Sequence, residues 1–297
     1  MKKVDVVIPV YNGERYIQEC LDSVFNQTYP ICHVIVVDDG STDGTMELLQ
    51  VELIKRQNLR VISGENRGVS DARNQGIQLV DSDYVAFLDC DDFWLKDKIA
   101  NQVNAFETSK HSYVGVASQY FTLGERGLFG AKSPHGVVTR NQLITLESTL
   151  PGSASSVLID LRRLPQLPKF ESGLAFGEDL DFWIQCAQLG DWYVTKYVDV
   201  VIRSNPDGAQ IKMLSKPEEA LRSMRYVLNK NRSLLGPVRF YLVDGYLFCV
   251  FLKGFLRLRK SVTLKELVNL EPRVHLRIIL GSTYYLYLKI RFFINKF

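Results

Sequence analysis

The segment Tyr84–Trp94 reads YVAFLDCDDFW, and it joins an apolar strand directly to a group of acidic residues. Tyr84–Leu88 has the composition of a buried β-strand, and Asp89, Asp91 and Asp92 follow it at once. Two ionised carboxylates about 5 Å apart repel each other by about 3 kcal/mol at an effective dielectric constant of 20. A fold accommodates such a group when a cation lies between the carboxylates or when one of them is protonated. The segment therefore predicts a strand that ends in a cation or ligand site.

Three further strands precede this segment and alternate with helices. They are predicted at Val4–Val10, at Val34–Val37 and, more weakly, at Val61–Ile62. Apolar residues at helical spacing predict helices over Glu14–Asn26, Met46–Ile54 and residues 69–80. Nearly continuous apolar strands separated by helices are typical of a mostly parallel sheet with helices on both faces. We therefore expect an α/β fold of the Rossmann-like type.

Polar residues follow the strong strands of this predicted sheet. Residues 11–13 (YNG) follow the first strand, residues 38–41 (DDGS) the second, and residues 89–92 (DCDD) the fourth. Ligands of such sheets bind beyond the carboxyl ends of the strands, so we expect these residues to share one site. Carboxylate oxygens are hard ligands that suit Mg²⁺ or Mn²⁺, and both ions leave coordination positions for phosphate oxygens.

Each polar group also has a structural interpretation. Asp92 could cap a helix predicted over Leu95–Phe106, and residues 38–44 could form a tight turn followed by a helix cap. The chain has no G-x-G-x-x-G and no Walker-type phosphate motif, so a bound phosphate would need a metal and positive side chains. Arg67 and Arg73 are candidates for that role, although solvated surface arginines are common.

Composition limits the class of protein. The chain is 46% apolar and 23% charged, which is typical of a globular protein. Its five cysteines include no C-x-x-C pair, so we expect neither a disulfide framework nor a zinc site, and we expect a reducing cytoplasm. Asp5 interrupts the first apolar run, so the start reads as a strand and not as a signal peptide. No nucleic-acid partner is expected.

The C-terminal part of the chain has a different character. From about Lys212 the pattern predicts helices, and we divide the chain into a domain over residues 1–210 and a helical region over residues 211–297. Residues 253–297 carry ten Lys or Arg and two acids, a net charge of +8, while the remainder carries −5. Its apolar runs, Tyr246–Leu252 and Ile278–Leu288, are shorter than the roughly 20 residues of a spanning helix. The region could contact an anionic membrane peripherally or pack as a bundle on the main domain.

Six short motifs in this order and spacing resemble the family 2 inverting glycosyltransferases. The motifs are VVIPVYN, QTYP, VIVVDDGSTDGT, ENRGVSDARNQG, FLDCDDFW and GEDLDFW. The resemblance is strong over residues 3–110, moderate over residues 150–192 and slight beyond residue 210. It implies a GT-A fold, here with a helical C-terminal extension, and a nucleotide-diphosphate sugar as donor.

The resemblance also implies roles for individual residues on the donor side. Asp39 would bond to the imide of the base, and Asp89 would contact the ribose or the sugar. Asp91 would ligate Mn²⁺ or Mg²⁺ on the diphosphate. The other donor-site residues that the resemblance implies are Pro9, Val10 and Tyr11 beside the base and Arg73 near the phosphates or sugar.

On the acceptor side the resemblance implies a base. Asp179 of the Gly177–Asp181 segment would remove a proton from the acceptor hydroxyl, and Glu178 would orient the acceptor. An acid in the first turn of a helix is also stabilised by the helix dipole, which is the alternative interpretation. The chain departs from the pattern at Asn205, where relatives often carry a histidine that completes the metal shell.

These roles together imply a reaction. We expect transfer of a hexose from a UDP-sugar, with inversion, to a hydroxyl of a lipid-linked or other saccharide acceptor. The setting would be O-antigen, capsule or exopolysaccharide assembly at the cytoplasmic face of the inner membrane. Two alternatives are a metal-dependent phosphohydrolase with Asp89 as nucleophile and a non-catalytic nucleotide-sugar-binding protein. Phe93 argues against the first, because that motif usually has Thr or Val there.

Overall fold

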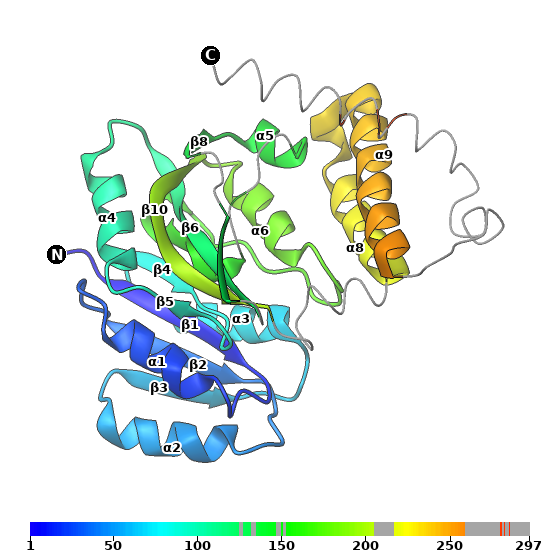
Figure 1. The fold of residues 1–297 in the computed structure, drawn as a ribbon. Coiled ribbons are helices and arrows are strands. Elements are labelled where there is room, and N and C mark those ends of the chain that lie inside the picture. Colours follow the sequence, from blue (N-terminus) through cyan, green and yellow to red (C-terminus); the bar gives the residue numbers. More distant parts are fainter. Residues whose placement is uncertain are drawn as a thin grey trace. The chain divides into compact units, whose positions relative to one another are not determined.

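The computed structural model describes residues 1–124, 127–131, 135–146, 150, 153–204 and 217–258, with the single residues 280, 282 and 285. The described chain forms one sheet with helices on both faces, followed by two C-terminal helices (Figure 1). The strands of the sheet lie in the order β3-β2-β1-β4-β9-β6-β10-β5, with β7 paired to β6 and β8 paired to β10. The predicted α/β fold is therefore confirmed.

Four parallel strands form the N-terminal half of the sheet (Figure 1). Ile8 pairs with Val36 on one side of the central strand, and Val7 pairs with Phe87 on the other. The predicted strands are confirmed with the bounds β1 Val4–Val10, β2 His33–Asp38, β3 Leu59–Ser63 and β4 Tyr84–Phe87. The helices that connect and follow them are α1 Ile17–Phe25, α2 Thr45–Lys55, α3 Val69–Ile77 and α4 Lys98–Thr108. Because the strands are parallel, their carboxyl ends meet at one edge.

Beyond β4 the sheet is mixed. β9 runs antiparallel to both β4 and β6, β10 runs parallel to β6, and β5 is antiparallel to β10. These strands are β5 Phe93–Trp94, β6 Tyr113–Gly124, β7 Gly127–Ala131, β8 Gly136–Val138, β9 Val157–Asp160 and β10 Asp191–Arg203. Short helices accompany them, namely α5 Arg140–Ile144, η1 Ala154–Ser156, η2 Leu161–Arg163 and α6 Glu178–Cys186.

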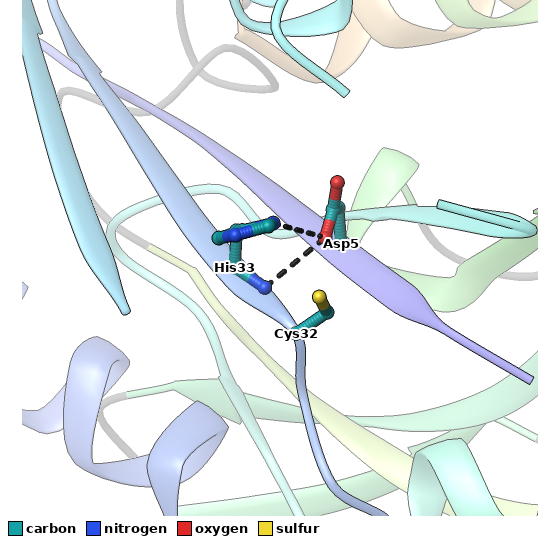
Figure 2. A group of neighbouring side chains, drawn as sticks. All are labelled: Asp5, Cys32 and His33. Carbon is teal, nitrogen blue, oxygen red and sulfur yellow. Dashed lines mark hydrogen bonds and ion pairs between the residues drawn. The ribbon is translucent and has the colours of Figure 1, made fainter. Parts of the chain in front are cut away.

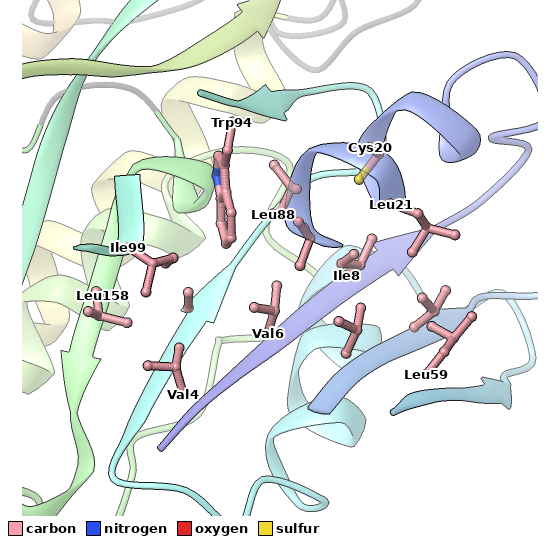
Figure 3. Close-up of a cluster of buried hydrophobic side chains, with 14 of the residues drawn as sticks. Val4, Val6, Ile8, Cys20, Leu21, Leu59, Leu88, Trp94, Ile99 and Leu158 are labelled. Atoms are coloured by element: carbon pink, nitrogen blue, oxygen red, sulfur yellow. The ribbon is translucent and has the colours of Figure 1, made fainter. Parts of the chain in front are cut away.

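One face of the sheet packs against α1 and α4. Val4, Val6 and Ile8 point from β1 into a cluster with Leu21 of α1 and Ile99 of α4 (Figure 3). All five side chains are fully buried. Burial of each such side chain contributes roughly 1.5–3 kcal/mol, so this cluster is a main source of stability for the sheet.

The other face is covered by α3 and α6. At Gly76 of α3 a β-carbon would lie 2.4 Å from a methyl carbon of Val7, so only glycine allows this close approach. The ring of Phe87 lies edge-on to Phe182 of α6 at 6.0 Å, and Phe182 stacks on Phe170 at 4.0 Å. Aromatic packing therefore fixes the middle of α6 against the sheet.

The chain divides into two compact units. The first comprises Met1–Arg140, Leu150–Gly173 and Asp181–Ser204, and the second comprises Asn141–Thr149, Leu174–Leu180 and Asn205–Phe297. The second unit contains the helices α8, Pro217–Lys230, and α9, Arg232–Leu258, with a kink at Gly236 and Pro237. In the described part of the chain, no helix combines the length and apolarity needed to cross a membrane. Most of the basic C-terminal region lies outside the described residues.

Candidate active site

The loops that follow β1 and β2 are bonded to each other at the carboxyl edge of the sheet. The backbone N–H of Asn12 donates to the Ser41 hydroxyl at 2.8 Å, and the backbone N–H of Thr42 donates to the side-chain oxygen of Asn12 at 2.7 Å. The Gly13 N–H donates to the Thr45 hydroxyl at 2.8 Å. These bonds hold the two loops together beside the end of β1. Pro9 and Val10 are buried there, and the Tyr11 side chain is 46% exposed.

Asp39 holds the loop that precedes α3. One carboxylate oxygen accepts the Arg67 N–H at 2.8 Å, and the other accepts the Gly68 N–H at 2.7 Å. Gly68 has a φ of 96°, a conformation that favours glycine. The Arg67 guanidinium turns away to Glu65 at the surface, where it is 64% exposed. Asp39 therefore shapes the loop around the site, and its bond to a base stays a prediction.

Arg73 and Asp89 form an ion pair inside this edge. An Arg73 guanidinium nitrogen lies 2.6 Å from a carboxylate oxygen of Asp89, and the guanidinium also lies over the Phe170 ring. The Arg73 side chain is 3% exposed and that of Asp89 is 23% exposed. The sequence predicted both residues in the site, and the structure brings them into direct contact.

The Asp89–Asp92 segment forms a tight turn, closed by the Asp92 N–H donating to the Asp89 carbonyl at 2.9 Å. Asp91 is half-buried within it. Burial raises the pKa of the Cys90 thiol, and the charges of Asp91 and Asp89 raise it further. Burial likewise raises the pKa of Asp92, and the charges of Asp89 and Asp91 add to the shift. The three carboxylates of this turn therefore influence one another, and the role of Asp91 as a metal ligand stays a prediction.

The capping role considered for Asp92 is wrong. α4 begins at Lys98 and not at Leu95, and its N-cap is Asp97, which makes no side-chain cap bond. Residues 93–94 form β5 instead, because they pair with β10. Asp92 accepts the Ser155 hydroxyl at 2.6 Å and the Arg203 N–H at 3.0 Å. Sequence reasoning missed both partners. The signal for Ser155 was the run of small residues at 153–156 before β9, whereas Arg203 contributes a backbone N–H that no side-chain pattern indicates.

The segment with the predicted base belongs to the second unit. Glu178 and Asp179 are the first residues of α6, and Leu174–Leu180 groups with α8 and α9. The Ala175 N–H donates to the Ser223 hydroxyl of α8 at 3.0 Å. Gly177 has a φ of 88°, and a β-carbon there would lie 2.6 Å from the sulfur of Met224. α8 therefore holds the start of α6, while the roles of Glu178 and Asp179 stay predictions.

The donor set of the first unit fits a hard divalent cation. Its side chains offer carboxylate oxygens, the ligands that Mn²⁺ and Mg²⁺ prefer, and Asp91 is accessible enough to bind an ion shared with a ligand. Arg73 compensates the charge of Asp89. Asn205, the position of the departure from the family pattern, lies outside the described residues.

A second group of polar side chains lies near the start of β1 and β2, away from this edge. Asp5, Cys32 and His33 have potential metal-ligand atoms within 4.8 Å of one another (Figure 2). Asp5 is fully buried, and one of its oxygens pairs with the His33 amide and ring nitrogens at 3.0 and 3.1 Å. Its other oxygen accepts the Asp81 N–H at 3.0 Å. These bonds satisfy the carboxylate, so the group ties the strand starts together.

A cavity of about 610 Å³ also lies outside the carboxylate edge. It is open to solvent, and none of the predicted site residues lines it. Its lining residues are Leu95, Lys96, Asp97, Ala100, Asn101, Tyr197 and Asp199.

Comparison with known proteins identifies the family. A family model described as "Glycosyl transferase family 2" matches residues 5–152. The chain is 32% identical over 190 residues to TuaG of Bacillus subtilis, named for teichuronic acid biosynthesis, with 63% of this chain and 73% of TuaG covered. It is 35% identical over 113 residues to WfaP of Escherichia coli, named a UDP-Glc:alpha-D-GlcNAc-diphosphoundecaprenol beta-1,3-glucosyltransferase, with 37% and 43% covered. The chain belongs to glycosyltransferase family 2.

The chain covers only 30–32% of the length of the first curated relatives it matches, which are glycosyltransferases of Rickettsia. Among solved structures, TarS 1–349 of S. aureus with UDP-GlcNAc has a TM-score of 0.66 at 21% identity, covering 98% of this chain and 91% of that one. The mannosyltransferase PcManGT of Pyrobaculum calidifontis with GDP-Man and Mn²⁺ has a TM-score of 0.59 at 18% identity, covering 96% and 87%. These matches confirm the predicted GT-A fold.

Proposed function

We propose that this chain transfers a hexose from a UDP-sugar to a hydroxyl of a saccharide acceptor, with inversion at the anomeric carbon. The observation that carries the proposal is the set of carboxylates, Asp39, Asp89 and Asp91, at the carboxyl edge of a family 2 sheet. The UDP-GlcNAc complex of the similarly folded TarS and the UDP-Glc in the name of WfaP support a UDP-sugar as donor.

The donor side combines a base site with a diphosphate site. Pro9, Val10 and Tyr11 border the base and Asp39 accepts its imide N–H. Asp89, held by Arg73, binds the ribose or the sugar. Asp91 would hold Mn²⁺ or Mg²⁺, which would supply positive charge against the charge that grows on the leaving diphosphate. The Mn²⁺ in the PcManGT complex supports this assignment.

The acceptor side requires a general base. Asp179 removes the proton of the acceptor hydroxyl while that oxygen attacks the anomeric carbon, and Glu178 orients the acceptor. Attack from the side opposite the leaving diphosphate inverts the anomeric centre. This chemistry accounts for a second acidic segment, which a phosphohydrolase built on Asp89 alone would not need.

The acceptor is a lipid-linked saccharide of a bacterial surface polysaccharide. The diphosphoundecaprenol in the name of WfaP supports this choice, as does the biosynthetic assignment of TuaG. The net charge of +8 over residues 253–297 would bring the enzyme to the anionic cytoplasmic face of the inner membrane, where such acceptors are presented.

The test is a transfer assay with a panel of nucleotide sugars and a synthetic diphospholipid-linked acceptor, read by mass spectrometry. We expect one UDP-hexose to be consumed with Mn²⁺ and no transfer in EDTA. Asp179→Asn should lower the rate by roughly 10²–10⁴-fold, the usual contribution of a general base, with nearly unchanged UDP affinity.

Glu47→Gln is the matched control for the helix-dipole interpretation of Asp179. Glu47 is an exposed acid in the first turn of α2, outside the predicted site. We expect wild-type transfer from this variant. Wild-type rates from Asp179→Asn would remove Asp179 as base, and release of free sugar phosphate or nucleotide without acceptor would favour a hydrolase.

A further inference from the structure

The Ser155 hydroxyl bridges the two ends of the Asp89–Asp92 turn. Its oxygen accepts the Asp89 N–H at 3.0 Å, and its hydrogen is donated to a carboxylate oxygen of Asp92 at 2.6 Å. Ser155 is fully buried, so solvent does not compete for either bond. One side chain therefore fixes both the first and the last residue of the turn that carries Asp91.

The protein core in turn fixes Ser155. Its N–H donates to the Ser153 hydroxyl at 3.2 Å, and its carbonyl accepts the indole N–H of Trp94 at 2.8 Å. Ser155 lies in η1, which leads into β9, and Leu158 of β9 pairs with Ala86 of β4. The position of the turn after β4 is thus fixed relative to β9, the neighbouring strand of the same sheet.

Asp92 extends this connection to a third strand. Its second carboxylate oxygen accepts the backbone N–H of Arg203 at 3.0 Å, and Arg203 is the last residue of β10. The bonds run from the end of β4 through Ser155 and Asp92 to the end of β10. Three elements that are distant in the sequence therefore set the position of one four-residue turn.

We propose that Ser155, acting with Asp92, is a positioning residue that holds Asp89 and Asp91 in place to bind the metal and the donor. The proposal rests on the proposed function, because it takes Asp91 as the metal ligand. Ser155 does not contact the donor itself in this proposal. A metal ligand must be held within a few tenths of an ångström, and bonds at both ends of a short turn provide that restraint.

Ser156 provides a matched control for a hydroxyl that only stabilises the fold. It is the neighbouring residue in η1, is also fully buried, and donates to the Ser153 carbonyl at 3.0 Å. Ser155→Ala and Ser156→Ala remove the same atom from the same short helix. Among the bonds recorded between described residues, those of the Ser155 hydroxyl reach Asp89 and Asp92, while that of the Ser156 hydroxyl reaches Ser153.

The experiment compares these variants in the full chain by Mn²⁺ titration with electron paramagnetic resonance, in the presence of UDP. Ser155→Ala should weaken Mn²⁺ binding at least tenfold and raise the donor KM similarly, while Ser156→Ala stays within about threefold of wild type. Hydrogen exchange of the amides of residues 89–92 should accelerate at least tenfold in Ser155→Ala alone.

Asp92→Asn is the second variant if Ser155→Ala does not fold, and it should accelerate the same amides. Equal Mn²⁺ affinity and equal exchange in the Ser155 and Ser156 variants would overturn the positioning role of Ser155. The proposed function would still hold in that case, provided that the wild-type chain transfers sugar. A wild-type chain that binds neither Mn²⁺ nor UDP would overturn both proposals. The exchange measurement needs no ligand, so the two failures are distinguishable.

Discussion

Arg73 and Asp89 lie sixteen residues apart in the chain, and each supplies the charge that the other needs. Asp89 shares its turn with Asp91 and Asp92, so its carboxylate lies among like charges, and a nearby cation offsets their repulsion. Arg73 is almost fully buried, and such a guanidinium is tolerated only when it is paired and hydrogen-bonded. The pair therefore stabilises the site before any ligand binds.

Replacement of Arg73 by methionine should be costly. The variant keeps much of the side-chain volume and leaves Asp89 without its guanidinium partner. We expect a loss of about 2–3 kcal/mol in the free energy of unfolding, somewhat less than the roughly 3–5 kcal/mol for a fully buried pair, because Asp89 is partly exposed. Urea denaturation measures this change, and transfer should fall with it.

Arg67→Met is the control for this variant. Arg67 and its partner Glu65 are 64% and 77% exposed, and ion pairs this exposed contribute little to stability because water and salt screen the charges. We expect no measurable change in the free energy of unfolding. If the two methionine variants were equally stable, the Arg73–Asp89 pair would not have the importance given to it here.

At the scale of elements, α8 decides where α6 begins. Ser223 and Met224 contact the segment just before Glu178 and Asp179. The motif residues near the start of α6 thus depend on a helix that lies beyond the residues matched by the family model. The C-terminal region is therefore part of what supports the predicted base.

Gly177→Ala should lower turnover more than donor affinity. An alanine there is strained at a φ of 88°, and its β-carbon would displace the buried Met224 and shift the start of α6. Misplacement of a catalytic group by about 1 Å can cost up to 10²-fold, so we expect a fall of at least tenfold in kcat. The KM for the donor should stay within about threefold, as steady-state kinetics would show.

Gly173→Ala separates backbone strain from the contact with Met224. Gly173 has a similar φ of 76°, but a β-carbon there meets no atom within 4 Å. Both variants carry the roughly 1–2 kcal/mol cost of a left-handed alanine. If Gly173→Ala lowered kcat as much as Gly177→Ala does, the contact with α8 would not explain the effect.

The helix expected from Leu95 shows what local patterns omit. The predicted helix is present from Lys98 onward. The residues before it, Phe93 and Trp94, form strand β5 and pair with Val201 and Val200 of β10. The QTYP motif holds the segment between β5 and α4 in place, because the Gln27 side chain donates to the Leu95 carbonyl and the Thr28 hydroxyl donates to the Asp97 carboxylate. Contacts with residues about 70 and about 107 positions away in the chain therefore override the local helix preference of residues 93–97.

At the scale of the whole molecule, the charge distribution predicts contact between the C-terminal region and an anionic membrane. Residues 253–297 carry a net charge of +8 in a chain whose remainder carries −5. Each basic residue near an anionic leaflet contributes about 1 kcal/mol of attraction. We therefore expect the full chain to sediment with anionic vesicles at low salt and much less with neutral vesicles.

Neutralising four basic residues of this region should reduce vesicle binding at least tenfold. The changes are Lys253→Gln, Arg257→Gln, Arg259→Gln and Lys260→Gln. A control variant removes the same number of charges from exposed positions of the first unit. Its changes are Arg60→Gln, Lys96→Gln, Lys110→Gln and Lys196→Gln. Equal loss of binding in both variants would mean that net charge and not the C-terminal region governs the interaction.

The sequence by itself determined the parallel half of the sheet and the edge at which its polar residues gather. Both follow from local information, since apolar runs fix the strands and parallel strands place their carboxyl ends together. Only the tertiary structure decided which groups Asp92, Asp39 and Asp89 bond to. Asp92 bonds to Ser155 and Arg203, Asp39 holds the loop before α3, and Asp89 pairs with Arg73. The physical reason is that a carboxylate's partners come from strands and loops far apart in the chain, and only packing brings them within bonding distance.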